Sequence, residues 1–128
     1  MAISGQAFEH VDFFWASFLE IARVIKPGGL VFLIAPSRGP EHRYPVDCWR
    51  FYPDGYRALS RWAGLFLVEV HTDWEPSSDP ESAQWGDTVG VFAKPQPRRG
   101  SALRRALGAR LVQIGGGLID RAVASEKL

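Results

Sequence analysis

The sequence predicts an α/β fold with a short, mostly parallel sheet, and three observations lead to this prediction. Apolar residues recur every three or four positions between residues 12 and 25, which is typical of one face of a helix. The continuous apolar run Leu30–Ala35 follows, and such a run suits a strand buried on both faces. A second helix-then-strand pattern covers residues 53–71. Helices that alternate with strands indicate α/β architecture.

Local start and stop signals support the two helices. Lys26-Pro27-Gly28-Gly29 ends the first, because a cation suits the negative end of a helix and proline and glycine do not continue it. Pro53 and Asp54 suit the first turn of the second helix, and Gly64 ends it. Its predicted inward face consists of Tyr56, Leu59, Trp62 and Ala63.

The remaining segments are assigned from composition. Residues 36–52 are mixed in charge and interrupted by proline, so we expect a loop. Phe66–His71 and Asp87–Ala93 are rich in strand formers, and the polar segment Trp74–Trp85 separates them. Ala2–Ser4 is a further short strand.

Charge divides the chain of 128 residues into two parts. Residues 1–94 carry eight Lys and Arg against twelve Asp and Glu, whereas residues 95–128 carry seven against two. Residues 95–100 contain two prolines and a glycine and read as a linker. We therefore expect an α/β domain over 1–94, a linker over 95–100 and a basic amphipathic helical appendage over 101–128.

Composition also narrows the classes of function. One cysteine excludes an internal disulfide framework and a four-cysteine zinc module. No apolar run is long enough for a transmembrane helix, and the first residues lack the features of a signal peptide, so we expect a cytoplasmic protein. The appendage favours packing on a protein partner, with a membrane surface as the alternative. Nucleic-acid binding is not expected, since its arginines have no nearby aromatic residues.

Two stretches resemble the second half of class I S-adenosylmethionine-dependent methyltransferases. Ser4–Val11 (SGQAFEHV) is similar to the family's S-x-x-x-x-E-H-V sequence after a strand, and Glu20–Leu30 (EIARVIKPGGL) is similar to its helix and L-K-P-G-G turn. His42–Gly55 (HRYPVDCWRFYPDG) resembles a branch of these enzymes found beside sugar and cell-envelope genes. The resemblance covers residues 1–94. It implies a partial Rossmann-like methyltransferase fold, with S-adenosylmethionine as cofactor and a small-molecule acceptor, such as a sugar or a lipid-linked compound.

The family's glycine-rich G-x-G-x-G turn and the acidic residue after it have no counterpart here. By the resemblance, the chain supplies strands four to seven of a sheet ordered 3-2-1-4-5-7-6, and the last strand is expected to run antiparallel to the others. We therefore expect an open sheet edge and an uncovered apolar helix face at Phe13, Phe14, Trp15 and Phe18. A homo-oligomer or a complementary methyltransferase half would cover them and complete the cofactor site. The alternative is a non-catalytic remnant that acts as an oligomerisation or regulatory module.

The resemblance also implies roles for residues near the first strand. Glu9 and His10 would face cofactor and acceptor, with His10 as a general base. The alternative is that the pair caps the first helix. Ser4 and Gln6 are the candidates for cofactor binding.

The loop after residue 36 supplies the candidates for acceptor binding: His42, Arg43, Trp49 and Arg50. Either arginine could pair with an anionic group. The competing interpretation is a structural Asp47–Arg50 salt bridge, with Trp49 anchoring the loop on the core. We expect Cys48 to be a passive thiol.

No metal is expected, although one alternative stays open. Glu9, His10 and His42 have ligand chemistry, and some methyltransferases of the superfamily carry a similar E-x-x-E-H cluster with a later histidine. In this chain Gln6 replaces the first glutamate, and an amide is a poor ligand. The competing interpretation of His42 is a solvated loop residue.

Overall fold

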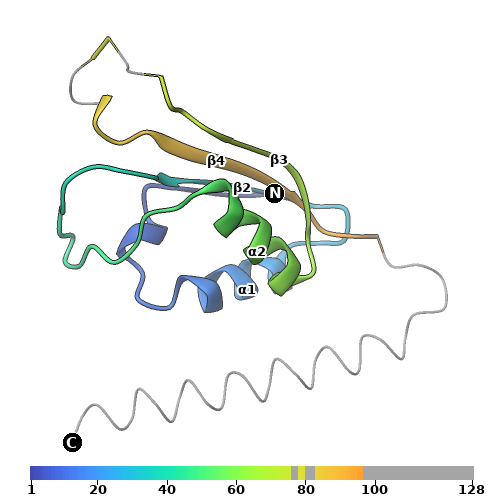
Figure 1. The fold of residues 1–128 in the computed structure, drawn as a ribbon. Coiled ribbons are helices and arrows are strands. Elements are labelled where there is room, and N and C mark those ends of the chain that lie inside the picture. The colour runs from blue at the N-terminus through green and yellow to red at the C-terminus, as the bar shows by residue number, and fades with distance from the viewer. Residues whose placement is uncertain (76–77, 80–82, 97–128) are drawn as a thin grey trace, which may run out of the picture. The chain divides into compact units, whose positions relative to one another are not determined.

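A computed structural model describes residues 1–75, 78–79 and 83–96. Within these residues the elements, in chain order, are β1 (Ala2–Gly5), a 3-10 turn η1 (Phe8–His10), α1 (Phe14–Val24), β2 (Leu30–Pro36), α2 (Pro53–Ala63), β3 (Phe66–Thr72) and β4 (Asp87–Ala93) (Figure 1). The elements predicted within residues 1–94 are therefore present, and the last strand has the predicted bounds.

The four described strands form one sheet in the order β1-β2-β4-β3. β1 and β2 are parallel, whereas β4 is antiparallel to both of its neighbours. Three strands thus share one direction and the last opposes them, as predicted. The order is also the one expected for strands four, five, seven and six of the family sheet. Because of the shared direction, β1, β2 and β3 end at the same edge of the sheet, where β4 begins.

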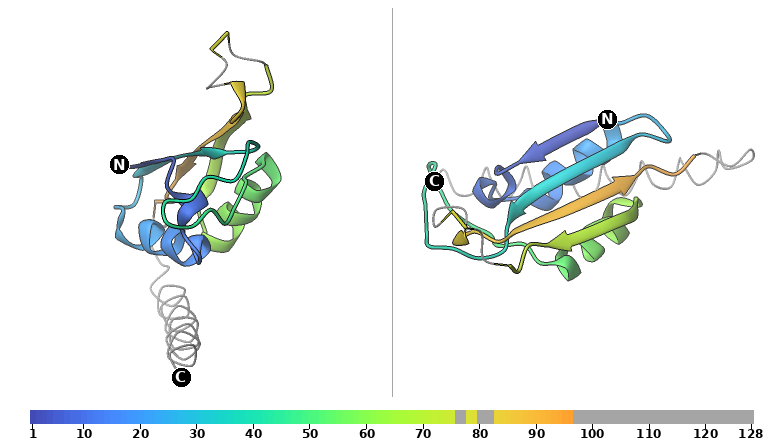
Figure 2. Two further views of the ribbon diagram at one scale, coloured as in Figure 1. Left: turned by 90° about the vertical axis from the view of Figure 1, so that its left-hand side faces the viewer. Right: turned by 90° about the horizontal axis from the view of Figure 1, so that it is seen from above.

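Both helices lie on one face of the sheet (Figures 1 and 2). Alternate residues of the strands point toward them, so that Leu33 of β2 and Phe92 of β4 are fully buried beside Phe18 of α1. Phe18 contacts Phe92 edge-on, with ring centroids 4.8 Å apart. Tyr56 of α2 is buried as well and packs over Gly90, where a Cβ atom would lie 2.4 Å from its ring. Gly90 therefore leaves room for that ring.

The predicted inward face of α2 is correct except for Trp62. Tyr56 and Leu59 are buried, but 63% of Trp62 is exposed. At 100° per residue, Trp62 lies about 120° around the helix from Tyr56, whereas Ala63 returns to the same side. Spacing places the apolar face on Tyr56, Leu59 and Ala63.

The expectation that the apolar face of α1 is uncovered is wrong for most of its aromatic residues. Phe18 is fully buried, and Phe14 lies against the rings of Trp49 and Phe51, which the chain itself supplies from the loop before α2. Only Phe13, at 40% exposure, keeps a large open surface among the four aromatic residues named for that face.

The open apolar surface is instead the face of the sheet opposite the helices. No described helix covers it, as the right-hand view of Figure 2 shows. Ile3, Phe32 and Val91 stand in register across it, and Phe66 lies at its β3 margin. Ile3 and Phe66 are about two-thirds exposed. β1 also leaves one backbone edge unpaired among the described residues, in line with the predicted open edge.

The described residues belong to one unit, Met1–Gln96. The predicted appendage over 101–128, and the part of the predicted linker after Gln96, lie outside the described residues. None of the described helices is long and apolar enough to cross a membrane.

Candidate functional site

The candidate site lies at the edge where β1, β2 and β3 end. In open α/β sheets, ligands bind outside the carboxyl ends of the parallel strands. The turn η1 follows β1 at this edge, and the loop 37–52 follows β2. The loop is fastened to the turn because the amides of Cys48 and Trp49 both donate to the backbone carbonyl of Glu9, at 2.7 and 3.3 Å. Residues nearly forty positions apart therefore meet here.

The carboxylate of Glu9 is the central feature of the site. Glu9 has no exposed surface, and neither carboxylate oxygen has a hydrogen-bond partner in the structure. Burial raises the pKa of Glu9, while its own backbone amide and the neighbouring His10, His42 and Arg50 act in the opposite direction. Glu9 belongs to η1 and the N-cap of α1 is Phe13, so the interpretation of Glu9 as a helix cap is wrong.

The imidazole of His10 has a defined orientation. Its Nδ1 lies 2.6 Å from the carbonyl oxygen of Val46. A carbonyl oxygen only accepts, so Nδ1 carries the proton and, in the neutral ring, Nε2 keeps a free lone pair. Nε2 faces Glu9, 3.7 Å from Oε1. The loop thus turns the basic nitrogen of His10 toward the buried carboxylate.

His42 completes the group. Its ring centroid lies 4.8 Å from that of His10 and 4.5 Å from that of Trp85, so the interpretation of His42 as a solvated residue is wrong. One ligand atom from each of Glu9, His10 and His42 lies within 4.8 Å of the other two. The backbone amide of His42 donates to Asp47 at 2.8 Å, which holds this part of the loop in place.

Asp47 and Arg50 form the structural salt bridge that the competing interpretation predicted. Two nitrogens of Arg50 bind the two carboxylate oxygens of Asp47 at 2.6 and 2.8 Å. Only 2% of the Asp47 side chain is exposed, and the guanidinium holds the pKa of Asp47 far below its usual range. Trp49 packs against α1 and donates its indole N–H to Val11 at 3.0 Å, so it does anchor the loop. A role for Arg50 or Trp49 in acceptor binding stays a prediction.

The other predicted site residues lie apart from this group. Arg43 is exposed and pairs with Glu41. Ser4 is paired with the fully buried Leu33 and therefore lies on the helix side of the sheet. Gln6 donates its side-chain N–H to Asp87 at the start of β4, at 2.7 Å. The roles of Ser4 and Gln6 in cofactor binding and of Arg43 in acceptor binding stay predictions.

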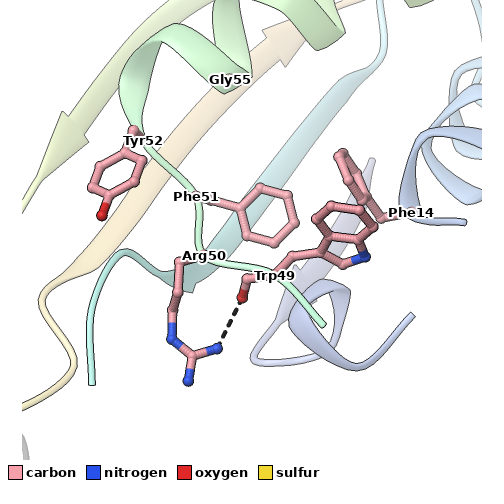
Figure 3. A pocket seen from close by; sticks show the side chains of 6 residues that line it. All are labelled: Phe14, Trp49, Arg50, Phe51, Tyr52 and Gly55. Carbon is pink, nitrogen blue, oxygen red and sulfur yellow. Dashed lines mark hydrogen bonds between the residues drawn. The ribbon is translucent and has the colours of Figure 1, made fainter. Parts of the chain in front are cut away.

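A small apolar cavity opens beside the site. It has a volume of about 130 Å³ and lies between the start of α1 and the start of α2. Figure 3 shows the rings of Phe14, Trp49 and Phe51 gathered on one side of it. An apolar cavity of about 150 Å³ holds a benzene molecule, so this one suits a single small ring. The residues that line it are Phe14, Trp49, Arg50, Phe51, Tyr52 and Gly55.

Sequence reasoning missed three participants at this edge. Trp85 packs against His42 with its ring tilted by 51°, the carbonyl of Val46 orients His10, and Asp87 accepts a hydrogen bond from Gln6. Only Asp87 gave a signal, as an acidic residue at the start of a predicted strand. Cys48 fits its predicted passive role, since desolvation and Asp12 raise the pKa of its thiol and so disfavour the thiolate.

No family model matches the sequence, and no curated protein matches it either. Solved structures are similar in fold. A chain of the complex between the Haloferax volcanii Trm112 methyltransferase activator and a methyltransferase is 21% identical, with a TM-score of 0.55, over 75% of this chain and 54% of that one.

Two further structures agree with it. A SAM-dependent methyltransferase from Methanosarcina mazei is 10% identical, with a TM-score of 0.57, over 74% of this chain and 58% of that one. A methyltransferase from Bacillus halodurans C-125 is 16% identical, with a TM-score of 0.55, over 73% and 63%. The matches thus span between half and two-thirds of these structures. Together with the strand order β1-β2-β4-β3, they show that this chain has a partial class I methyltransferase-like fold.

Proposed function

We propose that the chain is the acceptor-side part of an S-adenosylmethionine-dependent methyltransferase, and that polypeptide outside these 128 residues completes the cofactor site. Fold alone does not decide function, so the proposal depends on the site. The observation that carries it is the Glu9–His10 pair, with Glu9 buried and His10 oriented by Val46, at the edge of the sheet where such folds bind their ligands.

The described residues fit only part of a cofactor site. Among them, no glycine-rich turn joins the end of a strand to the start of a helix, which is where these folds hold a nucleotide cofactor. The unpaired edge of β1 and the open apolar face of the sheet are where further strands and helices would pack. A complementary methyltransferase half would meet this need, whereas a homo-oligomer would cover only the open edge and the apolar face, and one similar structure is itself a complex of a methyltransferase with an activator.

The chain's own residues would act on the acceptor. Bound S-adenosylmethionine would supply a methyl group to the acceptor oxygen. The cavity beside Phe14 and Phe51 would receive one ring of a small acceptor, for which a sugar or a lipid-linked compound stays the family-level candidate. Nε2 of His10 would take the proton of the acceptor hydroxyl, while the Val46 carbonyl keeps the other nitrogen protonated.

A second function is favoured by the open face of the sheet. An apolar face with Ile3 and Phe66 about two-thirds exposed is typical of an interaction surface. A non-catalytic module that binds a partner through this face would need no cofactor. The two functions differ in one respect, which is the binding of S-adenosylmethionine by the assembled protein.

The test measures mass and cofactor binding in the same samples. Light scattering should show an assembly larger than the 14.3 kDa chain. Val91→Lys, in the middle of the open face, should reduce the mass to that of a monomer, whereas Trp62→Lys, on the helix side, should not. Calorimetric titration should detect S-adenosylmethionine binding only in assembled samples. Micromolar binding by a monomer would overturn the requirement for a partner, and an assembly that never binds the cofactor would favour the non-catalytic module.

A further inference from the structure

Glu9, His10 and His42 form a group with unmet bonding capacity. Two imidazoles and a carboxylate lie close together there, all of them side chains that can bind a cation. Both oxygens of Glu9 are buried without a hydrogen-bond partner, and the polar contact of His42 Nδ1 is with Oδ2 of Asp47, 3.4 Å away. Such groups are rare in proteins because each costs free energy unless something binds it. The site therefore needs a proton or a cation that no described side chain provides.

A single proton does not satisfy the group. Nε2 of His10 is 3.7 Å from Oε1 of Glu9, so a shared proton would need the pair to close by about 1 Å. Such a proton would still leave the second oxygen of Glu9 without a partner, whereas Nδ1 of His42 lies 3.4 Å from Oδ2 of Asp47. A metal ion, in contrast, accepts an electron pair from each of three side chains at once.

The distances suit a metal ion after a small contraction. One ligand atom from each of the three residues lies within 4.8 Å of the others. Ligand atoms about 2.1 Å from a tetrahedral ion are about 3.4 Å apart. The group would have to close by up to about 1.4 Å, which side-chain rotations of two histidines and a glutamate can provide.

The surroundings already resemble the outer shell of a metal site. A metal-binding histidine usually donates its second N–H to a carbonyl or a carboxylate, which fixes the ring and the free nitrogen. His10 does so through Nδ1 to Val46. Asp47 accepts from the backbone amide of His42 and neutralises Arg50, so the charge of Glu9 remains available to a cation.

We propose that Glu9, His10 and His42 bind a first-row divalent metal ion, of the Zn²⁺ or Co²⁺ type, with one coordination position left open. Two imidazoles and one carboxylate favour such ions over Mg²⁺, which prefers oxygen ligands. Three protein ligands leave a position for water or an acceptor oxygen. The ion binds the lone pair that Nε2 of His10 keeps in the neutral ring, so in the metal-loaded form His10 is a ligand and not a base. Gln6 is not part of the set, because its amide is held by Asp87.

The experiment is a titration of the metal-free full chain with Co²⁺ and Zn²⁺, followed by calorimetry and by the visible absorption of Co²⁺. We expect one ion per chain, with micromolar or tighter affinity and an absorption band typical of four-coordinate Co²⁺. Glu9→Gln and His42→Gln should each weaken binding at least tenfold. The chain has three histidines, and His71→Gln on the exposed side of β3 is the matched control, which should bind within twofold of the parent.

Binding that survives both ligand variants would overturn the proposal, as would binding of Mg²⁺ as tight as that of Co²⁺. Failure of the parent chain to bind at 100 µM metal would do the same. Glu9→Gln keeps the size of the side chain and removes a buried charge, so we expect it to fold, and His42→Gln tests the site independently. The measurement needs no S-adenosylmethionine, and its result does not depend on whether the chain takes part in methyl transfer.

Discussion

At one end of the sheet the helix-end carbonyls are hydrogen-bonded, whereas at the other end several buried polar atoms have no partner. At the end where β2 begins, Lys94 donates from Nζ to the carbonyl oxygens of Ala22, Arg23 and Ile25, at 2.6 to 3.0 Å, and so caps the last turn of α1. The backbone amide of Gly28 also donates to the carbonyl of Lys94, and the amide of Lys94 donates to the carbonyl of Gly29. At the end where β2 finishes, Glu9, His42, Arg38 and Asp87 each keep a buried polar atom without a partner.

This difference separates stability from function within one small fold. Helix ends that are closed by hydrogen bonds contribute to stability and leave nothing for a ligand. Buried groups without partners cost stability, and they concentrate where a ligand later supplies the missing bonds. Substitutions at the first end should therefore destabilise the fold, whereas those at the second should destabilise it only where they remove a bond that the structure already makes.

The largest effect is expected at the Asp47–Arg50 ion pair, which holds the loop at the end of the sheet where β2 finishes. Asp47→Asn leaves Arg50 in a largely enclosed position without its two-point partner, and we expect the free energy of unfolding to fall by about 2 to 3 kcal/mol. Urea denaturation measures it. Glu41→Gln, which breaks the exposed pair with Arg43, is the control and should leave stability unchanged. Equal effects of the two variants would contradict the structural role of Asp47.

A somewhat smaller loss of stability is expected at the end of the sheet where β2 begins. Lys94→Met keeps most of the aliphatic stem but removes three hydrogen bonds to the end of α1, which should lower the free energy of unfolding by about 2 kcal/mol. Lys26→Met, an exposed lysine next to the same helix end, provides the comparison. If Lys26→Met destabilises the chain as much as Lys94→Met, the effect is one of general charge and not of the three bonds.

Below the candidate site, one buried bond links α2 to β4. The hydroxyl of Tyr56 donates to the carbonyl of Thr88 at 3.1 Å, and burial raises the pKa of that hydroxyl above its usual range. Tyr56→Phe should lower the free energy of unfolding by about 1 kcal/mol, since it removes one neutral hydrogen bond and keeps the ring. A loss above 3 kcal/mol in urea would show that the hydroxyl does more than make this bond.

Most of the fold could be predicted from the sequence because its signals are local. The apolar run at Leu30, the Pro53 helix start and the Gly64 stop each act within a few residues, and β4 was predicted with its observed bounds. The prediction that Trp62 faces inward is wrong because it follows from the apolar character of the side chain alone, whereas its angle around the helix places it on the exposed side. The open surface was assigned to α1, since nothing in the sequence says that Trp49 and Phe51 fold back onto Phe14.

For the candidate site, the sequence predicts which residues take part but not how they are arranged. Glu9 and His10 came from the resemblance, and His42 from its chemistry as a ligand. Their geometry depends on contacts across more than thirty residues, such as His10 to Val46 and the Cys48 amide to Glu9, which no local pattern encodes. For the same reason the orienting role of Val46 was missed, because a backbone carbonyl has no residue-specific signal.

The smallest effect is expected at Gln6. It tests whether exposed contacts at the end of the sheet where β2 finishes contribute to stability. Gln6 has a φ of 49°, a conformation that favours glycine, and its side chain makes one exposed hydrogen bond to Asp87. In Gln6→Gly the relief of backbone strain and the loss of that bond offset each other, so the free energy of unfolding should change by less than about 0.5 kcal/mol. Urea denaturation beside Lys94→Met measures the contrast. A loss as large as that of Lys94→Met would mean that both ends of the sheet are built for stability, and the distinction between them would fail.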